Sequence, residues 1–278
     1  MTAGQVRFVA VGDLMVDVVV AGRGHDAIAR LAPGGTAANA AAWAASLGAQ
    51  ATAMGSVGDD AGGRLLRAEL VRSGVEPILV VDATNPTGTF VVADGDLLVD
   101  RGANATFDPS VLPPLPEADA VLVSGYLPSA TLGAALAHAR ADWVLLDAAA
   151  LSTLPEGGNA VVANERQARA LTGTEPEEAV RALGERYRLA CVTLGARGAV
   201  AVLDGRLEHA EPAERALQEA PGAGDAFAAA LLVSLAGGRT LVDGLAEGCR
   251  AGAEAARAPG WPSVRESADA DERRREES

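Results

Sequence analysis

At 278 residues the chain is long enough for one large domain, and its net charge of −14 argues against a nucleic-acid partner, which normally needs a basic face. Hydrophobic residues make up 49% of the chain and aromatic residues only 3%, so the core must be built mainly from Ala, Val and Leu, as in many α/β proteins. All 23 basic residues are arginine, which excludes a Walker A loop ending in lysine, a Schiff-base lysine and the lysine of protein kinases.

Apolar strands and helical segments alternate in the first part of the chain. Residues 6–12 predict a buried strand, 36–49 an Ala-rich helix, 51–58 a second strand and 61–75 an amphipathic helix. This β-α-β-α order indicates a parallel sheet covered by helices. Residues 77–104 then break the rhythm with three short strand-like pieces separated by turns, which predicts a small antiparallel lid inserted at about 77–104.

The α/β order resumes after the lid. The sequence predicts strands at 120–125, 143–147, 160–164, 189–195 and 199–205, and helices at 129–141, near 176–187, near 223–236 and near 240–257. Residues 266–278 lack apolar content, so we expect a disordered tail behind a domain at 1–265.

No apolar segment has the length of a membrane span. Uncharged stretches fall short of the about 20 residues that cross a bilayer, and the N-terminus has no basic leader. We therefore expect a cytoplasmic protein without a membrane partner.

The stretch EAPGAGDAFAAALL (219–232) places an aspartate at the start of an apolar helix. Gly222, Ala223 and Gly224 allow close approach of a ligand to the backbone, and the first amides of a helix can hold an anion. Asp225 could equally be a first-turn residue that caps the helix or matches its dipole. The small residues before it, which a cap does not require, favour a functional interpretation.

Four motifs extend this interpretation over nearly the whole chain. They are PGGTAANAAAWAASLGAQATAMGSVGDDAGGRLLRAEL (33–70), NERQARALTG (164–173), VTLGARGA (192–199) and PGAGDAFAAALL (221–232). In this order they resemble the ribokinase-like sugar kinases of the phosphofructokinase-B type. The resemblance implies a three-layer α/β sandwich with a mostly parallel central sheet and a small β-sheet lid. It also implies transfer of the γ-phosphate of ATP, with Mg²⁺, to a hydroxymethyl group of a sugar or sugar acid.

The resemblance assigns the chemistry to the start of the apolar helix. Asp225 would be the general base that takes a proton from the sugar hydroxyl as that oxygen attacks the γ-phosphate. The backbone amides of Gly222, Ala223 and Gly224 would stabilise charge on the transferred phosphoryl group. One helix terminus would then activate the acceptor and hold the phosphate.

The sugar would bind near the end of the first strand. Asp13 and Asp17 follow that strand, where ligand sites of α/β proteins gather. The resemblance adds Gly34, Gly35 and Asn39 to the substrate-binding residues. Turn-forming aspartates and a helix-capping asparagine are the structural alternative.

The lid contributes two further substrate-binding candidates. Arg101 and Asn104 follow its last strand and could reach the substrate as the lid closes. Surface charge explains Arg101 equally well. The resemblance also allows a homodimer formed through the lid.

Five residues are candidates for nucleotide binding. Asn164, Thr193, Gly195 and Gly198 match family positions around ATP, and Gly248 falls near the adenine by rough alignment. A tight turn between two strands would explain Gly195 and Gly198 without any ligand.

The chain departs from the family pattern at two places. Gln167 stands where the family has a glutamate that organises magnesium and its waters; it keeps an oxygen but loses the charge, and Glu165 would point elsewhere. The metal ligands are therefore left open. Ala220 and Pro221 replace two threonines of the family, which places a monovalent-cation site in doubt.

Two rival functions remain from the sequence. In a nucleoside kinase of the same fold we would expect an aromatic side chain on which the base stacks, and Phe90 and Phe107 are the few available near the lid. A catalytically weak relative that binds sugar or nucleotide is motivated by Gln167 and opposed by Asp225. The expected partners are a small sugar and ATP.

Overall fold

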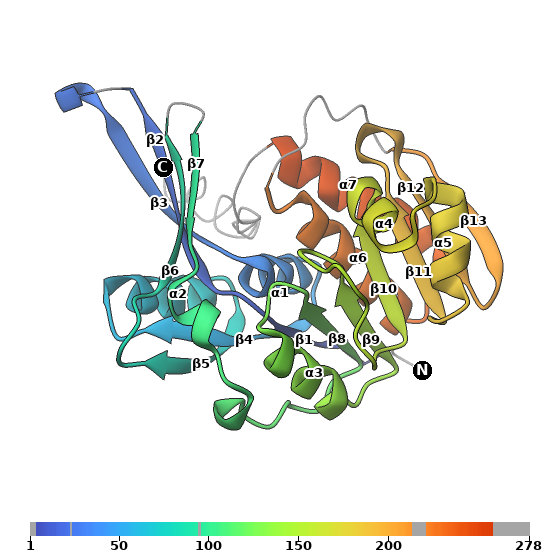
Figure 1. Cartoon of the computed structure of the whole chain (residues 1–278), viewed down its shortest axis with the longest axis horizontal. Coiled ribbons are helices and arrows are strands. Elements are labelled where there is room, and N and C mark those ends of the chain that lie inside the picture. The colour runs from blue at the N-terminus through green and yellow to red at the C-terminus, as the bar shows by residue number, and fades with distance from the viewer. Residues whose placement is uncertain (1–3, 23, 94–95, 213–220, 258–278) are drawn as a thin grey trace, which may run out of the picture.

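The computed structural model describes residues 4–22, 24–93, 96–212 and 221–257 (Figure 1). Within these residues the strands form a nine-stranded sheet, in the order β13-β12-β11-β10-β9-β8-β1-β4-β5, and a four-stranded sheet, in the order β3-β2-β6-β7. The expected tail at 266–278 lies outside the described residues, and so does Ala220, one of the two residues that place a monovalent-cation site in doubt.

The large sheet is mostly parallel, as expected. Its parallel strands are β1 (Arg7–Val11), β4 (Gln50–Gly58), β5 (Val75–Asp82), β8 (Ala120–Ser124), β9 (Trp143–Asp147), β10 (Ala160–Asn164) and β11 (Leu189–Thr193). The strands β12 (Ala199–Leu203) and β13 (Arg206–Ala210) extend it in antiparallel fashion. All carboxyl ends of the parallel strands therefore meet at one edge, where ligand sites form in such sheets.

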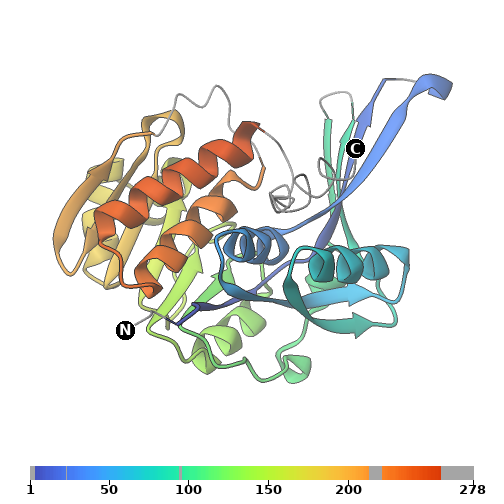
Figure 2. The ribbon, with the colours of Figure 1, turned by 180° about the vertical axis from the view of Figure 1, so that it is seen from behind.

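Helices cover both faces of the large sheet, which gives the expected three layers (Figure 2). One face carries α1 (Thr36–Ser46), α2 (Ala61–Arg72), α6 (Ala223–Ala236) and α7 (Leu241–Arg257). The other face carries α3 (Ser129–His138), α4 (Glu165–Thr172) and α5 (Pro176–Gly184). Short 3₁₀ turns connect elements at Gly24–Asp26, Gly102–Thr106, Pro109–Val111 and Gly195–Arg197.

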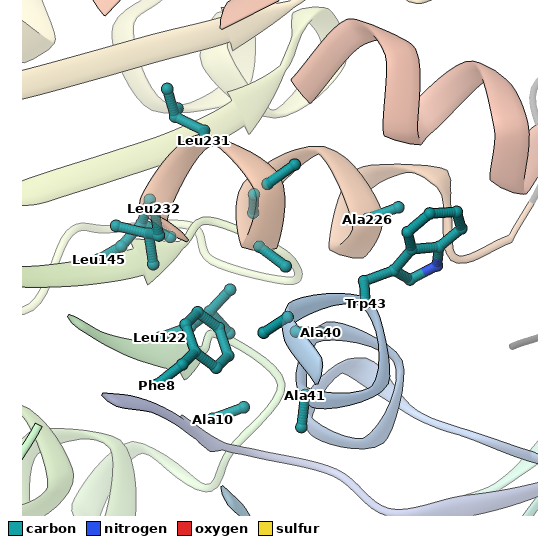
Figure 3. Close-up of a cluster of buried hydrophobic side chains, with 14 of the residues drawn as sticks. Phe8, Ala10, Ala40, Ala41, Trp43, Leu122, Leu145, Ala226, Leu231 and Leu232 are labelled. Atoms are coloured by element: carbon teal, nitrogen blue, oxygen red, sulfur yellow. The ribbon is translucent and has the colours of Figure 1, made fainter. Parts of the chain in front are cut away.

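Small side chains allow the helices α1 and α6 to pack closely against each other. Ala40 and Ala41 of α1 and Ala226 of α6 are fully or almost fully buried in the cluster drawn in Figure 3, beside Leu232. Alanine buries apolar surface while adding little volume, so helix backbones can pack closely. This packing brings the first turn of α6 next to the first turn of α1.

The lid differs from its prediction in two respects. Its strands are β2 (Met15–Ala21), β3 (Ile28–Gly34), β6 (Gly88–Ala93) and β7 (Asp96–Asp100), so half of it comes from 15–34 and not from 77–104. The apolar piece at 77–81 belongs to β5, which pairs in parallel with β4 of the large sheet. A strand, a helix and a strand in succession favour a parallel crossover, so β4, α2 and β5 form one β-α-β unit.

Candidate functional site

A cleft of ≈ 400 Å³ lies between the lid and the carboxyl edge of the large sheet. It is lined by Asp13, Met15, Asp17, Gly35, Thr36, Asn39, Phe90, Val99, Arg101, Tyr126, Asp147, Ala149, Val162, Ala163, Asn164, Gln167, Thr193, Pro221, Gly222, Gly224 and Asp225. Most of the residues expected from the sequence therefore meet at one site, although they come from both ends of the chain.

Asp225 faces this cleft from the first turn of α6. The helix begins at Ala223, and Gly222 before it adopts φ 84°, a left-handed conformation that favours glycine. The Asn39 side chain donates a hydrogen bond from Nδ2 to Oδ2 of Asp225 at 2.8 Å. No side-chain capping bond forms at this helix start in the part of the chain that the structure describes. Asp225 is therefore held by α1 and not used as a cap.

The environment of Asp225 disfavours its charged form. Burial raises the pKa of this carboxyl well above its usual value, and the charges of Asp147, Asp13 and Asp17 raise it further. The hydrogen bond from Asn39 acts in the opposite direction. A carboxylate with a raised pKa is a better proton acceptor than an ordinary aspartate.

Asp147 is the main acidic residue that the sequence analysis missed. It ends β9 and lines the cleft, and its Oδ1 accepts a hydrogen bond from the Ala149 amide at 3.3 Å. Burial raises its pKa to about 7; the Ala149 bond lowers the pKa, while the charge of Asp13 raises it. The strand WVLLD ends in an aspartate at the carboxyl edge of the sheet, and this signal could have found it.

Asp13 and Asp17 have different surroundings. Asp13 is buried: its Oδ1 accepts a hydrogen bond from Ser124 Oγ at 3.1 Å and its Oδ2 from the Thr36 amide at 3.3 Å, at the start of α1. Burial, followed by the charge of Asp13, raises the pKa of Asp17 to about 6. A Cβ on Gly34 would lie 2.1 Å from Oδ1 of Asp17, so Gly34 leaves space for that carboxylate and does not itself line the cleft.

The two candidates behind the lid have separate roles. Arg101 lines the cleft and donates a hydrogen bond from Nη2 to the carbonyl oxygen of Tyr126. Asn104 is 1% exposed: its Oδ1 accepts from the Leu14 amide at 3.0 Å, and its Nδ2 donates to the carbonyls of Leu14, at 2.9 Å, and Arg101, at 3.1 Å. The expectation that Asn104 reaches the substrate is therefore wrong, because its amide is used to join the lid to the loop after β1.

Aromatic residues are better represented in the cleft than the sequence analysis expected. Phe90 lines it from β6, and Tyr126, which that analysis did not consider, lines it from the loop after β8. Phe107 is 2% exposed and packs in the core on the other face of the large sheet, so it is not available to a ligand.

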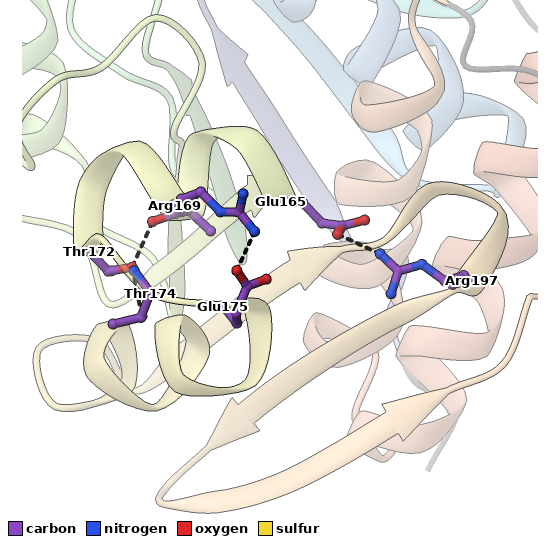
Figure 4. A network of polar contacts seen from close by, with 7 residues as sticks. Glu165, Arg169, Thr172, Thr174, Glu175 and Arg197 are labelled. Atoms are coloured by element: carbon purple, nitrogen blue, oxygen red, sulfur yellow. Dashed lines mark hydrogen bonds and ion pairs between the residues drawn. The ribbon is translucent and has the colours of Figure 1, made fainter.

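At the carboxyl end of β10, Asn164 and Gln167 cap α4 reciprocally. The Gln167 amide donates to Asn164 Oδ1 at 2.9 Å, and the Asn164 amide donates to Gln167 Oε1 at 2.8 Å. The side-chain oxygen of Gln167 thus accepts a bond from the Asn164 amide as part of a capping box. Glu165 points elsewhere, as expected, and pairs with Arg197 at 2.5 Å (Figure 4).

The predicted nucleotide glycines have packing roles in this structure. Gly195 and Gly198 form the turn between β11 and β12, where a Cβ on Gly198 would lie 2.0 Å from the Ala210 carbonyl oxygen. A Cβ on Gly248 would lie 2.9 Å from the Phe227 ring, so this glycine lets α7 pack against α6. Neither these three glycines nor Ala223 is among the residues that line the described cleft, whereas Thr193 is.

The described residues contain no cluster of three or more His, Cys, Asp or Glu side chains that could hold a metal ion. Magnesium in kinase sites is commonly held by one or two carboxylates together with substrate phosphates, so a protein cage is not required. In the same residues, no helix has the length and apolar character needed to cross a membrane.

Comparison with known proteins gives a consistent result. The model of the pfkB family of carbohydrate kinases matches residues 7–265. The fructokinase of Klebsiella pneumoniae is 30% identical over 257 residues, which is 81% of this chain and 83% of that protein. The bifunctional protein HldE of Azorhizobium caulinodans is 31% identical over 273 residues, but the chain spans only 57% of it. The ribokinase structure from Thermotoga maritima superposes with a TM-score of 0.79 at 21% identity, covering 92% of this chain and 94% of that one.

Proposed function

Since the chain belongs to the pfkB family of carbohydrate kinases, whose fructokinases and ribokinases are ATP-dependent sugar phosphotransferases, we propose that it transfers the γ-phosphate of ATP to a hydroxymethyl group of a carbohydrate. The observation that carries the proposal is the position of Asp225. Its carboxylate lies in the cleft, in the first turn of α6, and its pKa is raised.

In this mechanism Asp225 is the general base. It accepts the proton of the attacking hydroxyl, and Asn39 Nδ2 fixes the orientation of its carboxylate. The amides of Gly222, Ala223 and Gly224 lie at the start of α6, where helical N–H groups have no partner within the helix. Together with the helix dipole they would stabilise negative charge on the transferred phosphoryl group.

The two substrates would occupy opposite ends of the cleft. Asp17 and Asn39 offer hydrogen-bonding groups to sugar hydroxyls near the lid, while Asn164 and Thr193 lie at the ends of β10 and β11 for the nucleotide. Magnesium would arrive with the nucleotide phosphates and neutralise part of their charge. We place this reaction in the cytoplasm, where ATP is available.

The test combines a screen with one substitution. Magnesium-dependent ADP release should be measured over pentoses, hexoses, sugar acids and nucleosides. Asp225→Asn should then lower turnover of the best acceptor by about 10² or more, with nucleotide affinity largely kept. Asp243→Asn, which removes an exposed first-turn aspartate from α7, should leave turnover near that of the unmodified protein. Near-normal turnover in Asp225→Asn would remove this residue from the base role.

A nucleoside kinase is the second candidate, and one observation favours it. Phe90 and Tyr126 both line the cleft, so a base could stack on an aromatic ring there. Turnover of nucleosides above all sugars in the same screen would establish this alternative. Ligand-induced thermal stabilisation without any turnover would instead identify a catalytically weak binding protein.

We also propose that the lid mediates a homodimer. On the lid face opposite to the cleft, strand register aligns Leu31, Val18, Val91 and Leu98 in one row across the four strands. Leu31 and Leu98 are each 62% exposed. A second copy would cover this apolar row.

A further inference from the structure

We propose that the cleft selects uncharged or ammonium-bearing carbohydrates as acceptors and rejects anionic ones, such as sugar acids and sugar phosphates. The inference rests on the proposed function in taking the lid end of the cleft as the acceptor site. Its basis is the charge of the lining. Asp13, Asp17, Asp147 and Asp225 all line the cleft, and Arg101 is the single basic residue among the described ones that do.

Three of these carboxylates have few protein donors. A carboxylate can accept about four hydrogen bonds. Asp17 accepts none from the described residues, Asp147 accepts one from Ala149, and Asp225 accepts one from Asn39. These oxygens therefore require hydrogen-bond donors from the ligand or from water.

Asp13 differs from the other three carboxylates because protein groups donate hydrogen bonds to both of its oxygens. Ser124 and Thr36 donate to its two oxygens, and the start of α1 provides favourable partial charge. Its charge nevertheless remains near the cleft and contributes to the raised pKa of Asp17, Asp147 and Asp225. Hydroxyl and ammonium groups can donate to the remaining oxygens, whereas a carboxylate or phosphate offers further acceptors and repels them.

The described lining offers an anionic acceptor one cationic side chain beside four carboxylic side chains. The Arg101 guanidinium is bonded to the Tyr126 carbonyl, and no lysine exists anywhere in the chain. The phosphates of ATP would meet different surroundings, because the uncharged Asn164 and Thr193 line the cleft at the ends of β10 and β11. An acceptor anion would lack these groups and would face Asp17 and Asp225 directly.

The lid side of the cleft adds apolar surface around Asp17, which pairs in register with Phe90. Met15, Phe90 and Val99 line the cleft from the lid. A sugar ring presents hydroxyl groups at its edge and C–H groups on its face, so it can contact the carboxylates and the apolar lid side chains together. A charged substituent would gain nothing from the apolar lid side chains.

The test uses two acceptor series, in each of which the members differ in charge and keep a terminal hydroxymethyl group. One series is glucose, glucosamine, gluconate and glucose 1-phosphate; the other is fructose, 1-amino-1-deoxyfructose and fructose 1-phosphate. Each compound is measured with the full chain by ADP release with magnesium and ATP, and by calorimetric binding. In at least one series the neutral or ammonium member should exceed its anionic counterparts by about 100-fold or more, equal to about 2.7 kcal/mol.

The two readouts separate the inference from the proposed function. The expected binding order without ADP release would refute the kinase and support the charge selection. An anionic member that binds or reacts as well as its neutral counterpart would overturn the inference, and so would the absence of binding by every member of both series.

Substitution of single aspartates tests whether the negative charge of the cleft causes the preference for neutral acceptors. At about pH 8, above the pKa of about 7 of Asp147 and of about 6 of Asp17, Asp147→Asn and Asp17→Asn should each raise the anionic-to-neutral ratio of binding constants about tenfold. Each substitution then removes one negative charge with little change in shape. Asp96→Asn removes an exposed charge from the lid outside the cleft lining and should leave the ratio unchanged. An unchanged ratio in both cleft variants would overturn the inference.

Discussion

Replacing Asp147 by asparagine should stabilise the protein, and more strongly at alkaline than at acidic pH. The side chain lies at the end of β9, close enough to Asp225 and Asp13 for their charges to interact. Asparagine keeps the shape of the side chain and an oxygen that can accept from the Ala149 amide, but it cannot ionise. The substitution therefore removes the cost of the charge and keeps the contact.

The magnitude follows from the two pKa values of this carboxyl. Its pKa is 3.8 in the unfolded reference and about 7 in the folded protein, so the folded state binds the proton more tightly. The stability that this proton provides is fully present below about pH 4 and is lost as the pH rises through about 7. Linkage gives a cost of ionisation of about 2 kcal/mol at about pH 5.5 and about 4 kcal/mol at about pH 8.

The assay is urea or thermal unfolding of both proteins at about pH 5.5 and about pH 8. The stabilisation by Asp147→Asn should grow by about 2 kcal/mol between the two conditions, which is about 4–8 °C in Tm for a domain of this size. Asp142→Asn removes an exposed carboxylate just before the same strand and should change stability by less than about 0.5 kcal/mol at both pH values. Destabilisation by Asp147→Asn at about pH 8, or an equal effect at both, would refute the reasoning.

Two further predictions concern the lid. Asn104→Ala should destabilise the protein by about 2–3 kcal/mol in urea unfolding, because it leaves the buried Leu14 amide without its partner; a loss below about 0.5 kcal/mol would contradict the joining role. Leu98→Glu should convert the proposed dimer to a monomer in analytical ultracentrifugation, whereas Val242→Glu, at an exposed apolar position on α7, should not. A monomeric unmodified protein, or a dimer that survives Leu98→Glu, would contradict dimerisation through the lid.

The sequence predicted the elements whose patterns are local and strong. The helix near 223–236 matches α6, because Pro221 and Gly222 precede an uninterrupted apolar run. The meeting of Asn39 and Asp225 joins residues 186 positions apart, and no local pattern encodes it. Only the resemblance of the two motifs to one family brought these residues into one expected site.

The strands of the lid could not be assigned correctly from the local pattern of apolar residues. The runs at 15–21 and 77–81 are both short and apolar, yet β2 joins the lid and β5 joins the large sheet. Short apolar runs identify neither their pairing partner nor their sheet. The prediction for Asn104 was wrong for a related reason. Its side-chain amide can donate to a substrate or to the backbone, and the position of Leu14 in the folded protein determines that it donates to the backbone.

For Gln167 the local sequence alone predicts the observed role, whereas comparison with the family pattern drew attention to a metal instead. An asparagine followed three residues later by glutamine, at the start of a helix, is a capping-box pattern. The structure forms both bonds of that box, so the loss of a glutamate charge here does not by itself argue for lost activity.

The carboxylates of the cleft connect stability, catalysis and acceptor choice. Asp147 raises the pKa of Asp225 through its charge, so Asp147→Asn lowers that pKa at the same time as it stabilises the fold. A base with a lower pKa accepts the acceptor proton less readily. The same substitution also removes one of the charges that repel an anionic acceptor. The loss of stability expected at alkaline pH is thus the physical counterpart of the base and the acceptor selectivity that we propose for this cleft.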